Sequence, residues 1–258
     1  ALGGFMHQFF GWRGSFCLMS VIAVSLFSFL LLKVPETLSL RHKGRVSFKS
    51  FVSNYGLIAR NPLFFAYVSF FALAIVGEWC FLTMSPFYFE DVLHVPSHYF
   101  GLFVGGVALL YCVALGLLSK ITARWGDDVP LKAAPFCAIA GTGLFFVAYF
   151  FAPMNPYLIT VAVSIFMMGA AFGWFISVTK SLDLFPNNKG VASSVRGLSV
   201  MGSMALGGWI GRLIPSDSLA PVGLCLLTCT LLMTIISVYL HRRTVQENPL
   251  SDGMRNAA

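Results

Sequence analysis

The sequence has few charged residues, and this scarcity excludes an ordinary water-soluble protein. Asp, Glu, Lys and Arg make up only 10% of the 258 residues, whereas 57% are hydrophobic and the mean hydropathy is +0.81. Soluble domains carry about 25% charged residues. About 20 consecutive apolar residues suffice to cross a bilayer as a helix. We therefore expect a membrane protein with several spans.

The sequence also lacks the short motifs of the common enzyme classes. It contains no phosphate-binding loop ending in Gly-Lys-Ser/Thr, no Gly-x-Ser-x-Gly elbow and no His-Glu-x-x-His helix. An intramembrane hydrolase would need a nucleophile and a base inside its spans, where Glu78 is the clearly ionisable residue. We therefore predict that the protein is not an enzyme and uses no cofactor.

Candidate metal ligands are too few for a site. Cys225 and Cys229 share a helix face but supply only two thiols, and His94 and His98 have helical spacing with no third ligand nearby. The six cysteines all fall in apolar stretches, where they act as small apolar residues rather than as disulfide partners. We predict no metal site.

Seven long apolar stretches predict seven membrane-spanning helices and an all-α membrane protein. They are Ser15–Leu32, Leu63–Thr83, Tyr99–Ser119, Leu131–Phe151, Tyr157–Val178, Gly190–Ile214 and Val222–Leu240. Residues 1–10 look like the tail of an earlier helix, and a cleavable signal peptide would not be followed by six further spans. The expected units are a leading segment, a connector, a six-helix block and a tail: residues 1–33, 34–61, 62–241 and 242–258.

Lys and Arg gather in alternate joints between these stretches. Of the 17, only Arg13 and Arg212 fall on one side, and the other 15 fall on the opposite side. Cytoplasmic joints carry such an excess, so the connector 34–61 and the tail are predicted to be cytoplasmic. The net charge of +7 then reflects topology in a lipid bilayer and not nucleic-acid binding. The alternative for the Arg41–Lys49 cluster is an added contact with anionic lipid.

One joint, Val34–Asn61, is much longer than the others. It separates one leading helix from a block of six, which is the layout of half of a secondary transporter built from repeats. A seven-helix receptor is the rival interpretation, and it predicts joints of comparable length throughout.

Short motifs follow one another in a specific order. They are Gly3-Gly4 with Gly11-Trp12-Arg13, Pro35-Glu36-Thr37-Leu38, Ser85-Pro86-Phe87, Gly116-Leu117-Leu118 with Ala123-Arg124-Trp125-Gly126, and Gly190-Val191-Ala192-Ser193-Ser194. This series resembles the second half of the major facilitator superfamily, especially its Bcr/CflA group of drug:proton antiporters. Ala123 departs from the pattern, because the family loop has Asp there.

The resemblance implies a fold and a function. The fold would be the C-terminal six-helix bundle of a major facilitator, preceded by the tail of span five and by span six in residues 1–33. Spans one to four would lie outside this chain, which would then be a fragment, a truncated product or half of a split carrier, with an N-terminal half as a partner. The function would be proton-coupled export of small amphipathic or drug-like molecules across the cell inner membrane. The alternatives are a seven-helix receptor or channel-like protein and a nonfunctional remnant.

Glu78 is the strongest candidate for a substrate-binding residue. A carboxylate inside a span costs about 3 kcal/mol to insert, and such residues mark cavities or ion paths. Tyr67, Phe71 and Glu78 share a helix face, together with Ala74, and aromatic rings beside a carboxylate suit a cationic ligand. The alternative is that Glu78 lies near the outer interface and reaches towards water.

Further lining residues are predicted in the later spans. Met167 and Phe172 are the main candidates, and flexible Met side chains suit an adaptable cavity. The neighbouring candidates are Met168, Trp174, Met201 and Met204. Ordinary packing is the alternative for all of them.

The resemblance also implies gating residues. Gly116, Arg124 and Gly126 match the family's cytoplasmic loop, which latches an inner gate through charged contacts, and Asp183 is a plausible partner for Arg124. The alternative is that Arg124 only sets topology. Three glycine pairs one turn apart predict close helix contacts: Gly101 with Gly105, Gly169 with Gly173, and Gly207 with Gly211.

Overall fold

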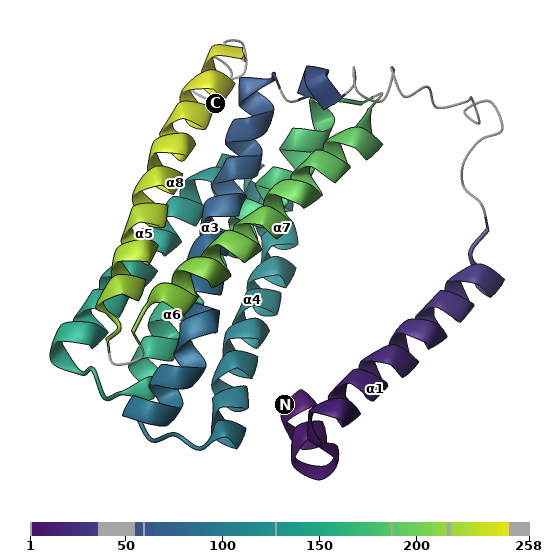
Figure 1. Cartoon of the computed structure of the whole chain (residues 1–258). Helices are drawn as coiled ribbons and strands as arrows, with labels where there is room; N and C mark the ends of the chain where they lie inside the picture. The colour runs from purple at the N-terminus through teal and green to yellow at the C-terminus, as the bar shows by residue number, and fades with distance from the viewer. Residues whose placement is uncertain are drawn as a thin grey trace.

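The computed structural model describes residues 2–35, 55–58, 60–126, 128–186, 188–215 and 218–247 (Figure 1). In this part of the chain every regular element is a helix, which confirms the all-α prediction. Most of the predicted connector and the end of the tail lie outside the described residues. The elements are α1 (Leu2–Lys33), α3 (Pro62–Phe87), the π-helix η2 (Tyr88–Val92), α4 (Ser97–Trp125), α5 (Asp128–Phe151), α6 (Pro156–Asp183), α7 (Lys189–Leu213) and α8 (Ala220–Glu247).

Six helical segments in the described residues are long and apolar enough to cross a membrane. They are Phe10–Lys33, Pro62–Val92, Tyr99–Trp125, Val129–Phe151, Pro156–Asp183 and Ala220–Arg243. The seventh predicted span, Gly190–Ile214, is the helix α7, which is more polar than these six. Its 25 residues still extend about 37 Å, enough to cross the hydrocarbon core. The protein is a multi-pass membrane protein.

Several helices continue beyond the ends predicted from hydropathy, among them α6, which continues from Val178 to Asp183, and α8, which continues from Leu240 to Glu247. The predicted span Leu63–Thr83 continues through Pro86 and then through η2 to Val92, and the predicted span Tyr99–Ser119 continues to Trp125. Hydropathy detects the part of a helix that lies in hydrocarbon. The hydrogen-bonded helix itself is longer, because its ends extend into the polar interface.

An Asn-Pro pair begins both α3 and α6. The side-chain oxygen of Asn61 accepts hydrogen bonds from two backbone N–H groups of the first turn of α3, both at 3.0 Å. Asn155 caps α6 in the same way, at 3.0 and 3.2 Å. Pro at the first helical position loses no hydrogen bond and fixes a helical φ. In Figure 1, α3 begins at the top and α6 at the bottom, so the triplets α3–α5 and α6–α8 start at opposite ends of the block.

The core of the block lies mainly between α3, α5, α6 and α8. Its largest fully buried side chains include Phe70, Phe145 and Phe166. Two buried polar contacts tie α5 to α8. The hydroxyls of Thr142 and Thr230 lie 2.9 Å apart, and the Ser237 hydroxyl donates to a carbonyl of the first turn of α5 at 2.8 Å.

Glycines bring α7 close to the backbone of α3. A Cβ atom added at Gly207 would lie 2.5 Å from the carbonyl oxygen of Val76, and one at Gly211 would lie 2.6 Å from that of Cys80. Real Cβ atoms essentially never approach within 3.0 Å. The predicted close contact is therefore present at this pair.

The other two predicted glycine pairs differ from each other. An added Cβ at Gly169 would lie 2.6 Å from the Ala134 carbonyl oxygen of α5, and one at Gly173 would touch the Phe70 ring at 3.4 Å. At Gly105 an added Cβ meets nothing within 4 Å, so the contact predicted there is wrong. Gly105 is exposed on α4, which is the least buried of the apolar spans in the block.

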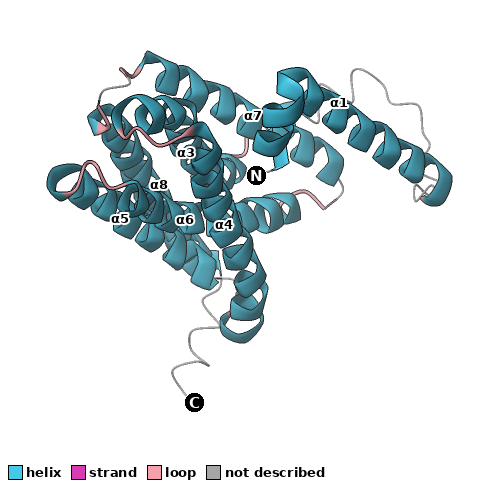
Figure 2. Cartoon of the chain, turned by 90° about the horizontal axis from the view of Figure 1, so that it is seen from below, coloured by secondary structure: helices cyan, strands magenta, loops and turns pink. Residues whose placement is uncertain are grey.

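The first helix lies outside the block of the other helices (Figures 1 and 2). The most apolar part of its span is not buried at all. Gly11 interrupts the helix with φ 65° and ψ −173°, a conformation that favours glycine. This interruption falls where the sequence predicts the end of one helix and the start of another.

Candidate functional site

An open cavity of about 450 Å³ lies among α3, α4, α6 and α7. Its size is in the range of small-molecule sites. Most of its walls are aromatic or aliphatic, and Glu78 supplies a carboxylate. The residues that line this open cavity are Phe71, Ile75, Glu78, Trp79, Tyr111, Leu115, Trp174, Val200 and Met204.

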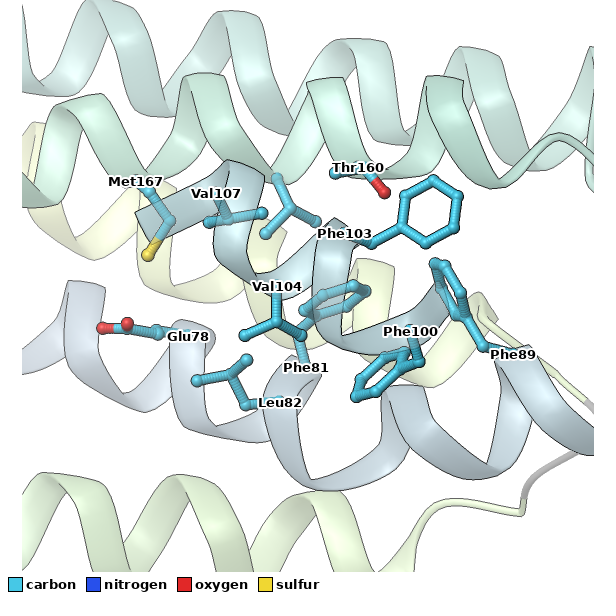
Figure 3. Close-up of a pocket in the computed structure, with 11 residues that line it drawn as sticks. Glu78, Phe81, Leu82, Phe89, Phe100, Phe103, Val104, Val107, Thr160 and Met167 are labelled. Carbon is cyan, nitrogen blue, oxygen red and sulfur yellow. The ribbon is translucent and has the colours of Figure 1, made fainter. Parts of the chain in front are cut away.

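A second, narrower space, the slot, adjoins Glu78 on α3 and lies against α4 and α6 (Figure 3). Its volume is about 20 Å³, which is room for a single water molecule and too little for a substrate. Glu78 lies at one end of this slot, and Phe89 and Phe100 lie at the other (Figure 3). The full lining is Glu78, Phe81, Leu82, Phe89, Phe100, Phe103, Val104, Val107, Thr160, Val163 and Met167.

Glu78 is half-buried at the boundary of both spaces. Among the described residues its carboxylate has neither an ion-pair partner nor a hydrogen-bond donor. The helix α3 begins 16 residues before Glu78, about 24 Å along the axis, and η2 ends 14 residues after it, about 21 Å away. Glu78 therefore lies near the middle of a long helix, which weakens the alternative of a carboxylate at the outer interface.

An aromatic pair forms part of the cavity wall. The rings of Phe71 and Trp174 meet edge to face, with centroids 5.1 Å apart. The Arg196 guanidinium of α7 lies over the Trp174 ring, 4.8 Å from its centroid. The Arg196 atoms Nε and Nη1 are buried and have no hydrogen-bond partner in the part of the chain that the structure describes.

Arg196, which contacts the cavity-lining Trp174 without lining the cavity itself, is a charged residue that was not predicted from the sequence as a site residue. The positive-inside tally treats it as a topology-setting charge in a joint. A signal was present, because Arg196 falls inside the predicted span Gly190–Ile214, where an ionisable residue is as unusual as Glu78 is in its own span.

The substrate-binding candidates fall in three places. Phe71 and Glu78 line the open cavity, and Met167 lines the slot. Tyr67 and Phe172 lie in the main core instead, with only 8% and 7% of their surfaces exposed. Of the neighbouring candidates, Trp174 and Met204 line the open cavity, whereas Met201 is exposed on the surface of α7.

Three of the gating candidates, Arg124, Gly126 and Asp183, lie at the end of the block where α4 ends and α7 begins, whereas Gly116 lies nine residues before the last residue of α4. Gly116 and Arg124 are exposed on α4, and Gly126 ends this helix with φ 87°, which favours glycine. Asp183 pairs with Lys189 at 3.9 Å. The expected pair between Arg124 and Asp183 does not form among the described residues, because Lys189 lies just across the short joint from Asp183 and is the nearer cation.

Metal binding has no support in the described residues. No three His, Cys, Asp or Glu side chains of these residues lie close enough together to hold an ion. The side chain of His98 lies outside the described part.

Comparison with models of protein families identifies a matching family. The family model described as Major Facilitator Superfamily matches residues 1–208, about four fifths of the chain. A search of curated proteins finds no match.

Proposed function

The chain belongs to the major facilitator superfamily of membrane transporters, and we propose that it is a proton-coupled exporter of small amphipathic or drug-like molecules. We further propose that it is of the Bcr/CflA-like drug:proton antiporter type, that α3–α8 form the C-terminal bundle, and that it acts in the cell inner membrane. Family membership favours a carrier over the receptor or channel alternative.

The observation that supports export of cations is the unpartnered Glu78 carboxylate in an aromatic cavity. Such a carboxylate can hold either a proton or the cationic group of a ligand, but it does not hold both at once. Binding of a cation from one side would release the proton, and rebinding of a proton from the other side would release the cation. Exclusive occupancy of one carboxylate is sufficient to couple the two movements in opposite directions.

The rest of the cavity suits varied apolar ligands. Phe71 and Trp174 offer ring faces and edges, and Met204 has a flexible thioether that adjusts to different shapes. Cation–π contact with such rings contributes about 0.5–2 kcal/mol for a cation. We propose Met167, in the slot beside Glu78, and the core residues Tyr67 and Phe172 as supports of the cavity wall.

We propose that the end of α4 takes part in an inner gate. The Asp183–Lys189 pair is solvent-exposed, and exposed ion pairs contribute only about 0–1 kcal/mol. Asp183 can therefore exchange Lys189 for Arg124 at little cost when α4 and α6 approach each other. Gly116 and Gly126, on either side of Arg124, allow close approach and a sharp end of the helix.

We propose that a first bundle completes the carrier. The open cavity is walled by α3, α4, α6 and α7 and opens to the surface. Alternating access requires two bundles that move about a central site. The partner would be a separately encoded or covalently preceding N-terminal half.

The test is proton-driven uptake into everted membrane vesicles that contain the chain and a first half from a related carrier. Ethidium serves as the cationic substrate and chloramphenicol as the neutral one. We expect Glu78→Gln to lower ethidium uptake at least about tenfold, a loss of about 1.4 kcal/mol, and to affect chloramphenicol less. Glu90→Gln, at an exposed outer position, is the matched control. Equal uptake of ethidium by the Glu78 variant would refute the role of Glu78, and absence of any uptake by the wild type would favour a nonfunctional remnant.

A further inference from the structure

Two charged side chains of opposite sign contact the wall of the open cavity at different heights: Glu78 lines it, and Arg196 lies over the lining residue Trp174 without lining the cavity itself. Arg196 lies seven residues into α7 from Lys189, whereas Glu78 lies 16 residues into α3 from Pro62, and both helices begin at the same end of the block (Figure 1). Phe71, whose ring meets the Trp174 ring under Arg196, precedes Glu78 by seven residues, or about 10 Å along the helix axis. The aromatic pair thus separates a guanidinium from a carboxylate.

Arg196 is incompletely compensated in this position. Contact with the Trp174 ring satisfies one face of its guanidinium. Two of its three nitrogens are buried without acceptors in the described residues, and an unmet buried donor of this kind costs about 1–3 kcal/mol or more when charged. An isolated cation at membrane depth calls for an anion. A planar guanidinium matches a carboxylate or another oxyanion best, because it can donate more than one hydrogen bond to it.

Glu78 does not supply this anion. No ion pair joins it to Arg196 in the described part of the chain, and Phe71, whose ring meets the Trp174 ring under Arg196, lies about 10 Å from Glu78 along the α3 axis. Two charges of opposite sign, separated by an apolar aromatic wall, are complementary to a ligand that carries both charges. The ligand would carry an anionic group at the Arg196 end and a cationic group at the Glu78 end.

We propose that Arg196 and Trp174 form an anion-recognition subsite and that the cavity selects zwitterionic aromatic substrates, with a carboxylate towards Arg196 and an amine towards Glu78. The proposal rests on the proposed function only in taking the open cavity as the substrate site. It narrows the substrate class from amphipathic cations to molecules with both charges on one apolar frame. Arg196 is then a specificity-determining residue.

The experiment measures equilibrium binding of three matched probes to the purified full chain in detergent by titration calorimetry. The zwitterion is 4′-(aminomethyl)biphenyl-4-carboxylate, the cation is its methyl ester, and the anion is 4′-methylbiphenyl-4-carboxylate. We expect the wild type to bind the zwitterion about tenfold more tightly than the ester, as a charged hydrogen bond implies. Arg196→Gln should remove this preference and change ester affinity less than about twofold.

Two further variants give the controls. Arg196→Lys keeps the charge without the planar donor fork and should retain part of the preference. Arg212→Gln changes an exposed arginine at the far end of the same helix and should leave the preference for the zwitterion unchanged. The ratio of the two affinities is taken within one preparation, so a partly unfolded variant still gives a valid result.

Three outcomes would overturn the proposal. The first is that the wild type does not bind the zwitterion, and the second is that Arg196→Gln leaves the ratio of zwitterion affinity to ester affinity unchanged. The third is that dioctanoyl phosphatidylglycerol displaces the anion probe while the wild type shows no preference for the zwitterion over the ester. The last result would assign the subsite to a lipid headgroup. These readouts need no proton gradient and no transport. Loss of vesicle uptake with an intact affinity ratio would therefore refute the exporter while leaving the subsite, and the converse pattern would refute the subsite alone.

Discussion

The glycine contact between α7 and α3 makes a quantitative prediction about stability. Replacing Gly207 by Ala puts a methyl group 2.5 Å from the Val76 carbonyl oxygen and 3.0 Å from the Trp79 Cβ atom. Ordinary contact begins at 3.4 Å, so α7 must retreat by about 0.9 Å. Overpacking of this kind typically costs about 1–3 kcal/mol. The obstacle is backbone, which cannot rotate away as a flexible side chain can.

Gly211→Ala should have a similar effect, because its methyl group meets the Cys80 carbonyl oxygen at 2.6 Å. The two positions lie one turn apart and require the same displacement of α7. The double variant should therefore lose less stability than the sum of the single variants. Gly202→Ala is the matched control on the same helix, since an added Cβ there meets nothing within 4 Å. It should be neutral or stabilising by up to about 1 kcal/mol through helix propensity.

The assay is thermal unfolding of the purified chain in a mild detergent, followed by helix circular dichroism. Each kcal/mol shifts the midpoint of a chain of this size by about 2–4 °C. Gly207→Ala and Gly211→Ala should each lower the midpoint, and Gly202→Ala should not. If all three variants unfolded at the same temperature, the close contact between α7 and α3 would be refuted.

Three further predictions concern single contacts and topology. Valine substitutions at Thr142 and Thr230, studied as a double-mutant cycle, should give a coupling of about 0.6 kcal/mol from their hydrogen bond, and zero coupling would contradict it. Asn61→Ala removes the cap of α3 and should lower the unfolding free energy by about 1 kcal/mol, whereas Asn61→Asp should restore most of it. In a cysteine-free background, a cysteine at Ser97 should react with an impermeant thiol reagent in intact cells and one at Ser50 should not; the reverse pattern would invert the predicted orientation.

The fold could be predicted largely from composition, because a bilayer leaves few ways to satisfy the backbone. Apolar stretches locate the helices to within a few residues at most ends. The errors have physical causes. High hydropathy marks only the part of a helix that lies in the hydrocarbon core, so it did not predict that α3 continues beyond Pro86 into η2. The spacing of glycines in the sequence does not show how close two helices lie. The pair that contains Gly105 and the pair that contains Gly207 therefore gave the same prediction, although of these two glycines only Gly207 lies against another helix.

The candidate site could be predicted only in part. Glu78 was identifiable because a carboxylate in a span is rare. Tyr67, Phe71 and Glu78 share a helix face, but residues on one face can contact different neighbouring residues, so the shared face did not predict their contacts. Tyr67 meets the main core, whereas Phe71 meets Trp174 of α6. Pairing of that kind depends on tertiary contacts. The sequence could have marked Arg196 as an ionisable residue within a span, but its contact with Trp174 also depends on tertiary structure.

The backbone contact between α3 and α7 has a consequence for the relative positions of Glu78 and Arg196. Glu78 is carried by α3 and Arg196 by α7, and Gly207 and Gly211 let the backbone of α7 approach the Val76 and Cys80 carbonyl groups of α3 directly. Direct backbone contact of this kind restricts movement of α7 against α3, so the backbone positions that carry the two charges keep a nearly constant separation. The cavity then selects ligands by the distance between their two charged groups. A zwitterion whose apolar spacer is too short reaches one protein charge only. In a series that lengthens the spacer by one methylene at a time, affinity should be highest at a single length.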